Sequence, residues 1–427
     1  MKQHLSLAYF FHPNLFVIMK TISCSSLLLA GLLFFASCAN DNKSASANTG
    51  SSAEAPTAAP APGASSTDIG AEKPEFYLHA AAVDKLLMRE EPSQKSTKVV
   101  YKIAKGELLE GNGEVSDNIE TAMLSGIEIE APFYRVNSTT PDKKTGWVFG
   151  GALRTVYAGP KSGSPDQARV AMLAKTLASF KLTELSSGQK AWDYVRKNFS
   201  DANGALADAA FMLLEQHIRS MVFDGNFYNM TERVQWADTD YNKVSAGSFD
   251  MNSTPVTRQL AAAGMSLGTA EGMIFPTVDY KRLQDFFGNK LTPAMREYLA
   301  QTTKEEADPM YDDGGIMIPL ETVAERAFFW EQFNKKYPWF VRREETANSE
   351  RWAGTALLCG ADNTPIYDFE SEKINEDHKN AWKSVLSKYP GSTLATDTKA
   401  FYDLCEAEAW KMTPKVRAWM EERNQVE

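Results

Sequence analysis

The segments GIEIEAPFYRVNS, residues 126–138, and KKTGWVFGGAL, residues 143–153, decide the fold of the first globular region. In the first segment Ile127, Ile129 and Ala131 alternate with glutamates, which is the period-two pattern of a strand with one buried face. The second segment contains another short apolar run that ends at a pair of glycines. Short strands bounded by turn residues predict a small antiparallel β structure.

The same pattern extends towards the N-terminus. Residues 85–111, KLLMREEPSQKSTKVVYKIAKGELLEG, alternate short apolar runs with the turn residues Pro92-Ser93 and Lys105-Gly106. Residues 111–126 make a longer connection, where we expect an enlarged loop. We therefore assign residues 76–157 to one small β region, a barrel or a sandwich.

These strands resemble the bacterial SH3-like (SH3b) domain. Leu87-Met88-Arg89 is similar to its opening strand, and Ile103 to Leu108 to part of the next strand pair. Phe133-Tyr134-Arg135-Val136 is similar to the family's aromatic-x-basic-Val strand, and Gly146-Trp147-Val148 to its closing Gly-Trp-Val. The resemblance is confined to the β region and implies an SH3-like β-barrel.

The resemblance also implies a role. In secreted bacterial proteins this family binds cell-wall peptides or glycans, or docks a partner. Aromatic side chains on a rigid barrel can stack on sugar rings or clamp an extended peptide. The candidate ligand-binding residues are Phe133, Tyr134, Trp147 and Phe149. For Trp147, in the middle of a strand, the alternative to ligand binding is that its side chain fills the barrel core. For Tyr134 both roles, ligand binding and core packing, stay possible.

The N-terminus predicts export. Lys20 is followed by an apolar run over residues 27–35, which is shorter than a membrane-spanning helix, and then by small residues. Phe35-Ala36-Ser37-Cys38 resembles a bacterial lipobox, although Phe35 departs from the usual leucine. The resemblance implies that residues 1–38 hold a lipoprotein signal peptide, cut before Cys38, and that this cysteine is lipidated. Translation can start at Met1 or at Met19.

Residues 39–75 are rich in Ala, Ser, Pro and Thr, without an aromatic residue. Such a segment cannot bury enough apolar surface to offset its ordering entropy, so we expect a disordered linker spanning roughly 30–35 Å. Ala39, rather than aspartate, follows the lipidated position. By the sorting rule of enteric bacteria this favours a cell-envelope location at the outer membrane of a Gram-negative bacterium.

Helical spacing replaces the period-two pattern over residues 163–427. Ser164, Pro165 and Gln167 predict a cap, a first-turn proline and a capping-box glutamine before an apolar helix. In residues 204–223, apolar side chains at 211, 214, 218 and 221 share one helix face. We expect a mainly α-helical domain of seven to ten helices.

Two of these helices end alike, in FWEQFNKKYPWF and AWKSVLSKYPGS. An aromatic residue followed by Lys-Tyr-Pro is similar to the ends of helical-hairpin repeats such as tetratricopeptide units. The intervals around the two copies do not repeat cleanly, so the pattern does not predict a solenoid.

Two short segments resemble catalytic or metal-binding motifs but lack the sequence context that those motifs require. Gly264-Met265-Ser266-Leu267-Gly268 has the G-x-S-x-G spacing, and His378 lies downstream with Asp362 and Asp368 between, but an alanine-rich run precedes it instead of a strand. Asp238 begins a calcium-like loop that lacks the required glycine and closing glutamate. We expect close helix packing at the first motif and a solvated turn at the second.

Metal and thiol chemistry is equally limited. No histidine or cysteine pair has zinc spacing, and His217 lies on an amphipathic helix where packing is the expected role. We therefore expect no metal and no cofactor. Cys359 and Cys405 are the two cysteines of the folded region. In an oxidising compartment they form either a disulfide or two separately buried thiols, and the latter is favoured.

The net charge of −10 argues against nucleic acid, whose binding needs a basic surface. The favoured function is a lipid-anchored envelope protein that binds or scaffolds, with the SH3-like module contacting peptidoglycan peptide, glycan or an envelope protein. The alternative is a hydrolase that acts on an envelope polymer and is targeted by the same module. Its first candidates for acid–base work are Glu271 and Asp279. No catalytic residue is assigned.

Overall fold

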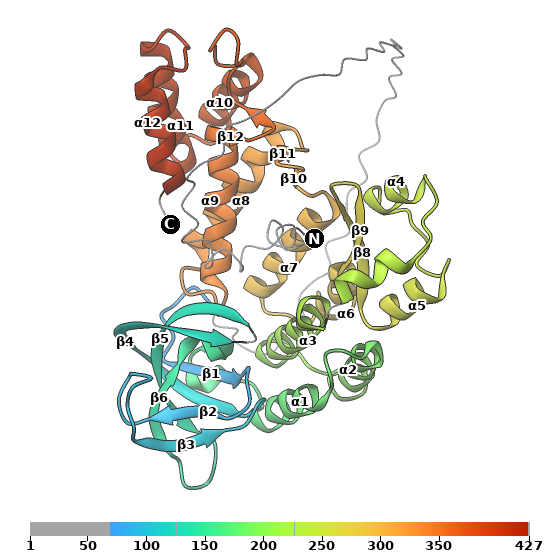
Figure 1. Ribbon diagram of the computed structural model, residues 1–427. Helices are drawn as coiled ribbons and strands as arrows, with labels where there is room; N and C mark the ends of the chain where they lie inside the picture. The colour runs from blue at the N-terminus through green and yellow to red at the C-terminus, as the bar shows by residue number, and fades with distance from the viewer. Residues whose placement is uncertain (1–68, 125, 226, 426–427) are drawn as a thin grey trace, which may run out of the picture. The chain divides into compact units, whose positions relative to one another are not determined.

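The computed structural model describes residues 69–124, 126–225 and 227–425 (Figure 1). In this part of the chain a seven-stranded antiparallel sheet is followed by a mainly helical region. The predicted order, first β and then α, is confirmed.

The sheet has the strand order β3-β2-β6-β5-β4-β1-β7. Its strands are β1 (Phe76–Ala81), β2 (Leu86–Arg89), β3 (Val99–Ile103), β4 (Leu108–Leu124), β5 (Ile127–Ser138), β6 (Thr145–Phe149) and β7 (Leu153–Gly159). Within the described residues no ladder joins the edge strands β3 and β7. The sheet is therefore not a closed barrel, and of the predicted SH3-like β-barrel the structure shows an antiparallel β region.

An apolar cluster to which every strand contributes forms the core of the sheet. Its buried members are Ala81, Leu86, Met88, Ile103, Leu109, Phe133, Val136, Val148, Phe149, Ala152 and Leu153. Of the period-two residues named from the sequence, Ile129 and Ala131 are partly buried and pack against this cluster.

Residues 111–124, predicted as part of an enlarged loop, belong to a strand. β4 has 17 residues and stays paired with β5 as far as Leu124 opposite Ile127. The ladder shifts register twice, between Gly111 and Val115 and again before Ile119. Such bulges accommodate turn-forming residues, including Gly113 at a φ of +82°, without ending the strand. The turn-forming residues that predicted a loop therefore lie in a strand whose pairing is irregular.

The helical region has twelve α-helices in its described part, more than the seven to ten predicted. The excess comes from short helices that lack a full apolar period. The bounds are α1 (Gln167–Ser179), α2 (Leu185–Asn198), α3 (Ala205–Asp224), α4 (Asp240–Ser245), α5 (Pro255–Ala262), α6 (Tyr280–Phe287), α7 (Pro293–Ala307), α8 (Leu320–Lys336), α9 (Arg343–Cys359), α10 (Glu376–Lys388), α11 (Thr393–Ala407) and α12 (Pro414–Gln425).

Four small hairpin or turn elements complete this region. They are the hairpins β8 (Met265–Ala270) with β9 (Met273–Val278), β10 (Tyr311–Asp312) with β11 (Gly315–Ile316), and β12 (Gly360–Ala361) with β13 (Thr364–Pro365), and the 3-10 segment η5 (Phe227–Arg233). Two further 3-10 turns, η3 (Gly150–Ala152) and η4 (Lys161–Gly163), flank β7.

The N-cap of the first helix lies two residues later than predicted. Asp166, not Ser164, is the N-cap of α1, and its carboxylate accepts hydrogen bonds from the backbone N–H groups of Ala168 and Arg169 at 3.0 and 3.1 Å. An aspartate accepts as well as a serine at this position and adds a favourable charge. The predicted stripe of α3 is confirmed, since all four of its apolar side chains are fully buried.

The sheet and the first helices share one core. Phe76, Leu78 and Leu108 belong to the same cluster of buried residues as Leu173 of α1 and Phe211 of α3. The two regions predicted as separate domains lie in one compact unit. Helix α1 also packs tightly on the turn before β4, where a Cβ on Gly106 would lie 2.6 Å from a carbonyl oxygen of the helix.

The end of the predicted linker takes part in this packing. Ile69 and Ala71 lie against the shared core, and the backbone N–H of Trp339 donates to the carbonyl of Gly70 at 2.8 Å. Residues 69–71 are thus held by the helical region.

A second core lies within α8 to α12 and contains the buried residues Val323, Leu357, Trp382 and Phe401. The two Lys-Tyr-Pro motifs each end a helix, α8 and α10, just before the next helix begins. The pairs α8–α9 and α10–α11 are consecutive helical hairpins (Figure 1). Phe328 stacks on the tyrosine of the second motif, Tyr389, with 4.1 Å between ring centroids.

Candidate binding groove on the sheet

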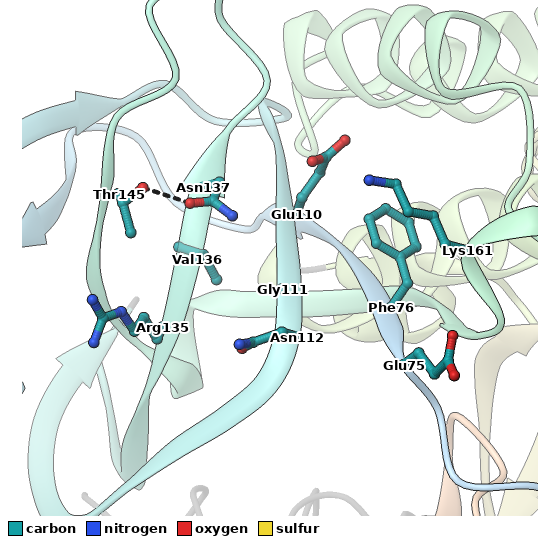
Figure 2. A pocket seen from close by; sticks show the side chains of 10 residues that line it. All are labelled: Glu75, Phe76, Glu110, Gly111, Asn112, Arg135, Val136, Asn137, Thr145 and Lys161. Carbon is teal, nitrogen blue, oxygen red and sulfur yellow. Dashed lines mark hydrogen bonds between the residues drawn. The ribbon is translucent and has the colours of Figure 1, made fainter.

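A groove of about 300 Å³ crosses the sheet, from β6 over β5 and β4 to the start of β1 and to η4 (Figure 2). We call it the outer-face groove. Its lining residues are Glu75, Phe76, Glu110, Gly111, Asn112, Arg135, Val136, Asn137, Thr145 and Lys161. Figure 2 shows Arg135 and Thr145 at one end and Phe76 and Lys161 at the other.

Strand register brings the polar side chains of the groove together. Glu110 lies opposite Asn137 in the β4–β5 ladder, and Asn137 lies opposite Thr145 in the β5–β6 ladder. Residues directly opposite in an antiparallel pair point to the same face. The hydroxyl of Thr145 donates to the Asn137 side-chain oxygen at 2.6 Å, which leaves the amide N–H₂ of Asn137 available to a ligand.

The groove offers both signs of charge. Arg135 is exposed, and its guanidinium lies 3.4 Å from Glu114 in a solvent-exposed ion pair of little energetic weight. At the other end the ammonium of Lys161 lies over the Phe76 ring, 5.8 Å from its centroid. Glu75 and Glu110 supply the acidic groups. A ligand with both amine and carboxylate groups finds partners for each.

Two of the predicted aromatic residues lie elsewhere. Phe133 is 1% exposed and Phe149 is 6% exposed, and the two rings pack edge to face with 5.8 Å between centroids. Both belong to the core of the sheet, so neither ring presents a face to a ligand. We therefore exclude these two residues from the candidate site.

The other two predicted residues are half-buried. Trp147 packs on the sheet core and carries the Arg135 guanidinium 5.8 Å from its ring centroid, so it adjoins the groove through that arginine. Tyr134 packs against His79 at 5.6 Å, and burial, together with the charge of Glu344, raises the pKa of its hydroxyl. Of the four predicted residues, Trp147 is the one whose position supports ligand binding.

None of the residues that line the groove, Glu110, Asn137, Thr145 and Lys161 among them, was predicted from the sequence as a ligand-binding residue. No local signal marks them, because β4 and β5 contain many other polar residues. The sequence does not say which of them lie side by side, since pairing register is a tertiary property.

The helical region contains a buried ionic cluster, formed by Glu215, Arg219, Tyr280, Tyr298, Arg342 and Glu345. The Glu215 carboxylate is fully buried, pairs with Arg219, and accepts hydrogen bonds from Arg342 and from the hydroxyl of Tyr280, both at 2.8 Å. The guanidinium of Arg342 also donates a hydrogen bond to the Tyr298 hydroxyl at 2.9 Å, and that hydroxyl in turn donates to the carboxylate of Glu345.

Electrostatics explain why this cluster is stable. Burial alone would raise the pKa of Glu215, but the charges of Arg219 and Arg342 outweigh it and lower the pKa to about 2. Both guanidinium groups are paired with carboxylates. The cluster therefore ties α3 to α6, α7 and α9, and it serves the fold.

The two acids proposed for hydrolysis are far apart. Glu271 is in the turn that joins β8 to β9, whereas Asp279 is the N-cap of α6 and accepts from the N–H of Arg282 at 2.9 Å. The whole of β9 separates them, roughly 20 Å at the rise of an extended strand. Paired catalytic carboxyl groups of glycosidases lie within about 10 Å, so these two cannot act as one pair.

The G-x-S-x-G motif has the wrong geometry for a nucleophile elbow. Helix α5 precedes it, and Ser266 is in strand β8, whereas the elbow needs a strand first and a helix second. Gly264 has a φ of +87° and packs against the indole of Trp192. Gly264 therefore forms a tight turn that packs closely on α2, and the rest of the motif lies in strand β8.

The remaining polar candidates have structural roles. Asp240, within the calcium-like segment, starts the short helix α4, and its carboxylate accepts from the N–H of Ala237 at 2.9 Å. His217 is buried against Phe180, and burial, with the charge of Lys105, lowers its pKa to about 4. Across residues 69–124, 126–225 and 227–425, no group of three or more His, Cys, Asp or Glu side chains is placed to hold a metal ion.

Cys359 and Cys405 are both free and buried. The alternative of two separate thiols is thus the one observed. Burial raises the pKa of Cys359 to about 11 and that of Cys405 to about 12, so neither is a thiolate at neutral pH. Neither has the low pKa of a catalytic cysteine.

Cys38 and the signal-like segment lie outside the described residues. In the described part of the chain, no helix has both the length and the apolar character needed to cross a membrane.

Comparisons with known protein families, with curated proteins and with solved structures found no match.

Proposed function

We propose that the chain is a lipid-anchored cell-envelope protein whose SH3-like sheet binds peptidoglycan peptide, glycan or an envelope protein. It is anchored through Cys38 at the outer membrane of a Gram-negative bacterium. The lipobox-like sequence and the Ala/Ser/Pro-rich linker support the location. The observation that carries the binding role is the outer-face groove, with its charged and hydrogen-bonding side chains.

The chemistry of the groove suits a polar polymer. Peptides and amino-sugar chains present amides, hydroxyls and charged groups, which Asn137, Thr145 and Arg135 can hydrogen bond. The β strands beneath hold these side chains at fixed spacing, which limits the entropy lost on binding. The ring of Trp147 beside Arg135 adds an apolar surface for stacking.

The binding test is sedimentation of the mature protein with purified peptidoglycan and with envelope fractions. Wild type should be retained, and Arg135→Ala and Asn137→Ala should each weaken retention by about tenfold, or about 1.4 kcal/mol. Lys383→Ala, which removes an exposed charge from α10, is the matched control and should bind like wild type. Equal retention of all variants, or no retention of wild type, would contradict the proposal.

The same incubation separates binding from hydrolysis. A binding protein leaves the polymer intact, whereas soluble fragments appearing in the supernatant would identify a polymer-acting hydrolase. Loss of those fragments in Glu271→Gln would assign the activity to the carboxylate named from the sequence.

The location is tested by fractionation and by mass spectrometry of the mature N-terminus. Cys38→Ser should move the protein out of the membrane fraction and abolish acylation. Cys24→Ser, a cysteine of the same segment, is the control and should leave both unchanged. An unmodified N-terminus in wild type would refute the anchor and leave the groove untouched.

A further inference from the structure

The β4–β5 hairpin continues beyond the rest of the sheet. β1 pairs with β4 only over residues 108–111, and β6 pairs with β5 only over residues 133–137. Between these limits and the turn, the two strands pair with each other over residues 115–124 and 127–134. We call this part the β4–β5 ribbon.

The two faces of the ribbon differ. Ala122, Leu124 and Ile129 pack against the sheet core. On the other face Ile119 is 63% exposed and Met123 is 65% exposed. The exposed face thus carries long apolar side chains, although the inner face already supplies the contacts that hold the ribbon to the sheet.

The exposed face is also acidic. Met123 lies opposite Glu128, and both Glu128 and Glu130 are exposed and form no ion pair with any described residue. Residues 106–134 contain no lysine or arginine. Seven acids fall in this stretch: Glu107, Glu110, Glu114, Asp117, Glu120, Glu128 and Glu130.

The ribbon is held in place. Glu120 accepts hydrogen bonds from the Ser93 hydroxyl at 2.7 Å and from the Gln94 N–H at 2.8 Å, and the Gln94 side chain donates to the carbonyl of Thr121 at 2.9 Å. These contacts fix the ribbon against the loop that follows β2. A preorganised surface loses little entropy on binding.

We propose that the exposed face of the β4–β5 ribbon docks a cationic segment of a partner protein. Lysine and arginine match this face, because their apolar stems can cover Ile119 and Met123 while their charged ends meet Glu128 and Glu130. An anionic lipid surface would be repelled by the same carboxylates, so the occupant is a protein segment. The ribbon is separate from the outer-face groove and adds a second binding surface.

The test uses fluorescent short peptides of alternating lysine and valine, with alternating glutamate and valine as the comparison. The mature full chain should bind the cationic peptide and not the acidic one. The double variant Glu128→Lys/Glu130→Lys should weaken binding by at least about tenfold, and Ile119→Ser/Met123→Ser should weaken it by a similar factor. All four positions are exposed, so an unchanged melting temperature will show that the variants fold.

A matched control separates this site from general attraction to an acidic protein. Glu421→Lys/Glu422→Lys makes the same change in charge on the exposed end of α12 and should leave binding within about twofold of wild type. An equal loss in this control, or no loss in the ribbon variants, would overturn the proposal. Binding to vesicles that contain phosphatidylglycerol, abolished by the ribbon variants, would overturn it in favour of a lipid surface.

Discussion

The buried ionic cluster makes the sharpest prediction for stability. Glu215 is fully buried on α3 and is shared between Arg219 and Arg342. Glu215→Gln keeps the shape of the side chain and removes its charge. Two guanidinium groups, with side chains only 10% and 13% exposed, then lose their common counter-ion.

The magnitude follows from the cost of leaving a buried charge unpaired. Removing one partner of a buried ion pair typically costs about 3–5 kcal/mol. The Glu345 carboxylate remains 3.9 Å from Arg342 and still neutralises part of its charge. We therefore expect Glu215→Gln to lower the free energy of unfolding by about 3 kcal/mol. That is a large fraction of the 5–15 kcal/mol by which domains are typically stable.

Urea unfolding of wild type and variant, followed by circular dichroism, measures this difference. Asp285→Asn is the control, because Asp285 pairs with Lys281 at an exposed site on α6. The control should change the free energy of unfolding by less than about 0.5 kcal/mol. A Glu215→Gln variant as stable as the control would refute the assignment of the cluster as a tie between helices.

Two further predictions concern pH and backbone conformation. Burial lowers the pKa of His378 to about 4, so the unfolded chain takes up its proton near pH 6.5 and the folded chain does not. The free energy of unfolding should therefore fall by about 2 kcal/mol between pH 6.5 and pH 4.5 through this group, and His378→Phe should lack this part of the loss when both are titrated with urea. Gly264→Ala should lower stability by about 2–4 kcal/mol, because φ is +87° and the added methyl would overlap the indole of Trp192. Gly354→Ala, in open space on helix α9, should instead be neutral or stabilising, and equal melting temperatures for these two variants would contradict the reasoning.

Local patterns determined the elements of this protein. The buried stripe of α3 and the strand around Trp147 follow from apolar period and turn residues, which are properties of contiguous segments. Helix boundaries were less certain, as the cap at Asp166 shows, because several neighbouring residues can accept the same N–H groups. The Lys-Tyr-Pro motifs marked true helix ends for the same local reason.

Contacts between residues that are distant in the sequence were decided by the tertiary structure. Glu215 and Arg342 are 127 positions apart, and nothing local to either predicts their pairing. Register alone placed Glu110, Asn137 and Thr145 in one groove, and packing in the sheet core buried Phe133, so its ring has no face free for a ligand. The sequence by itself determined where most strands and helices form, because hydrophobic period is read along the chain, but it misassigned the bulged part of β4 and missed the shortest helices. Which side chains meet, and hence where a ligand can bind, depends on packing between segments, and only the folded chain defines that.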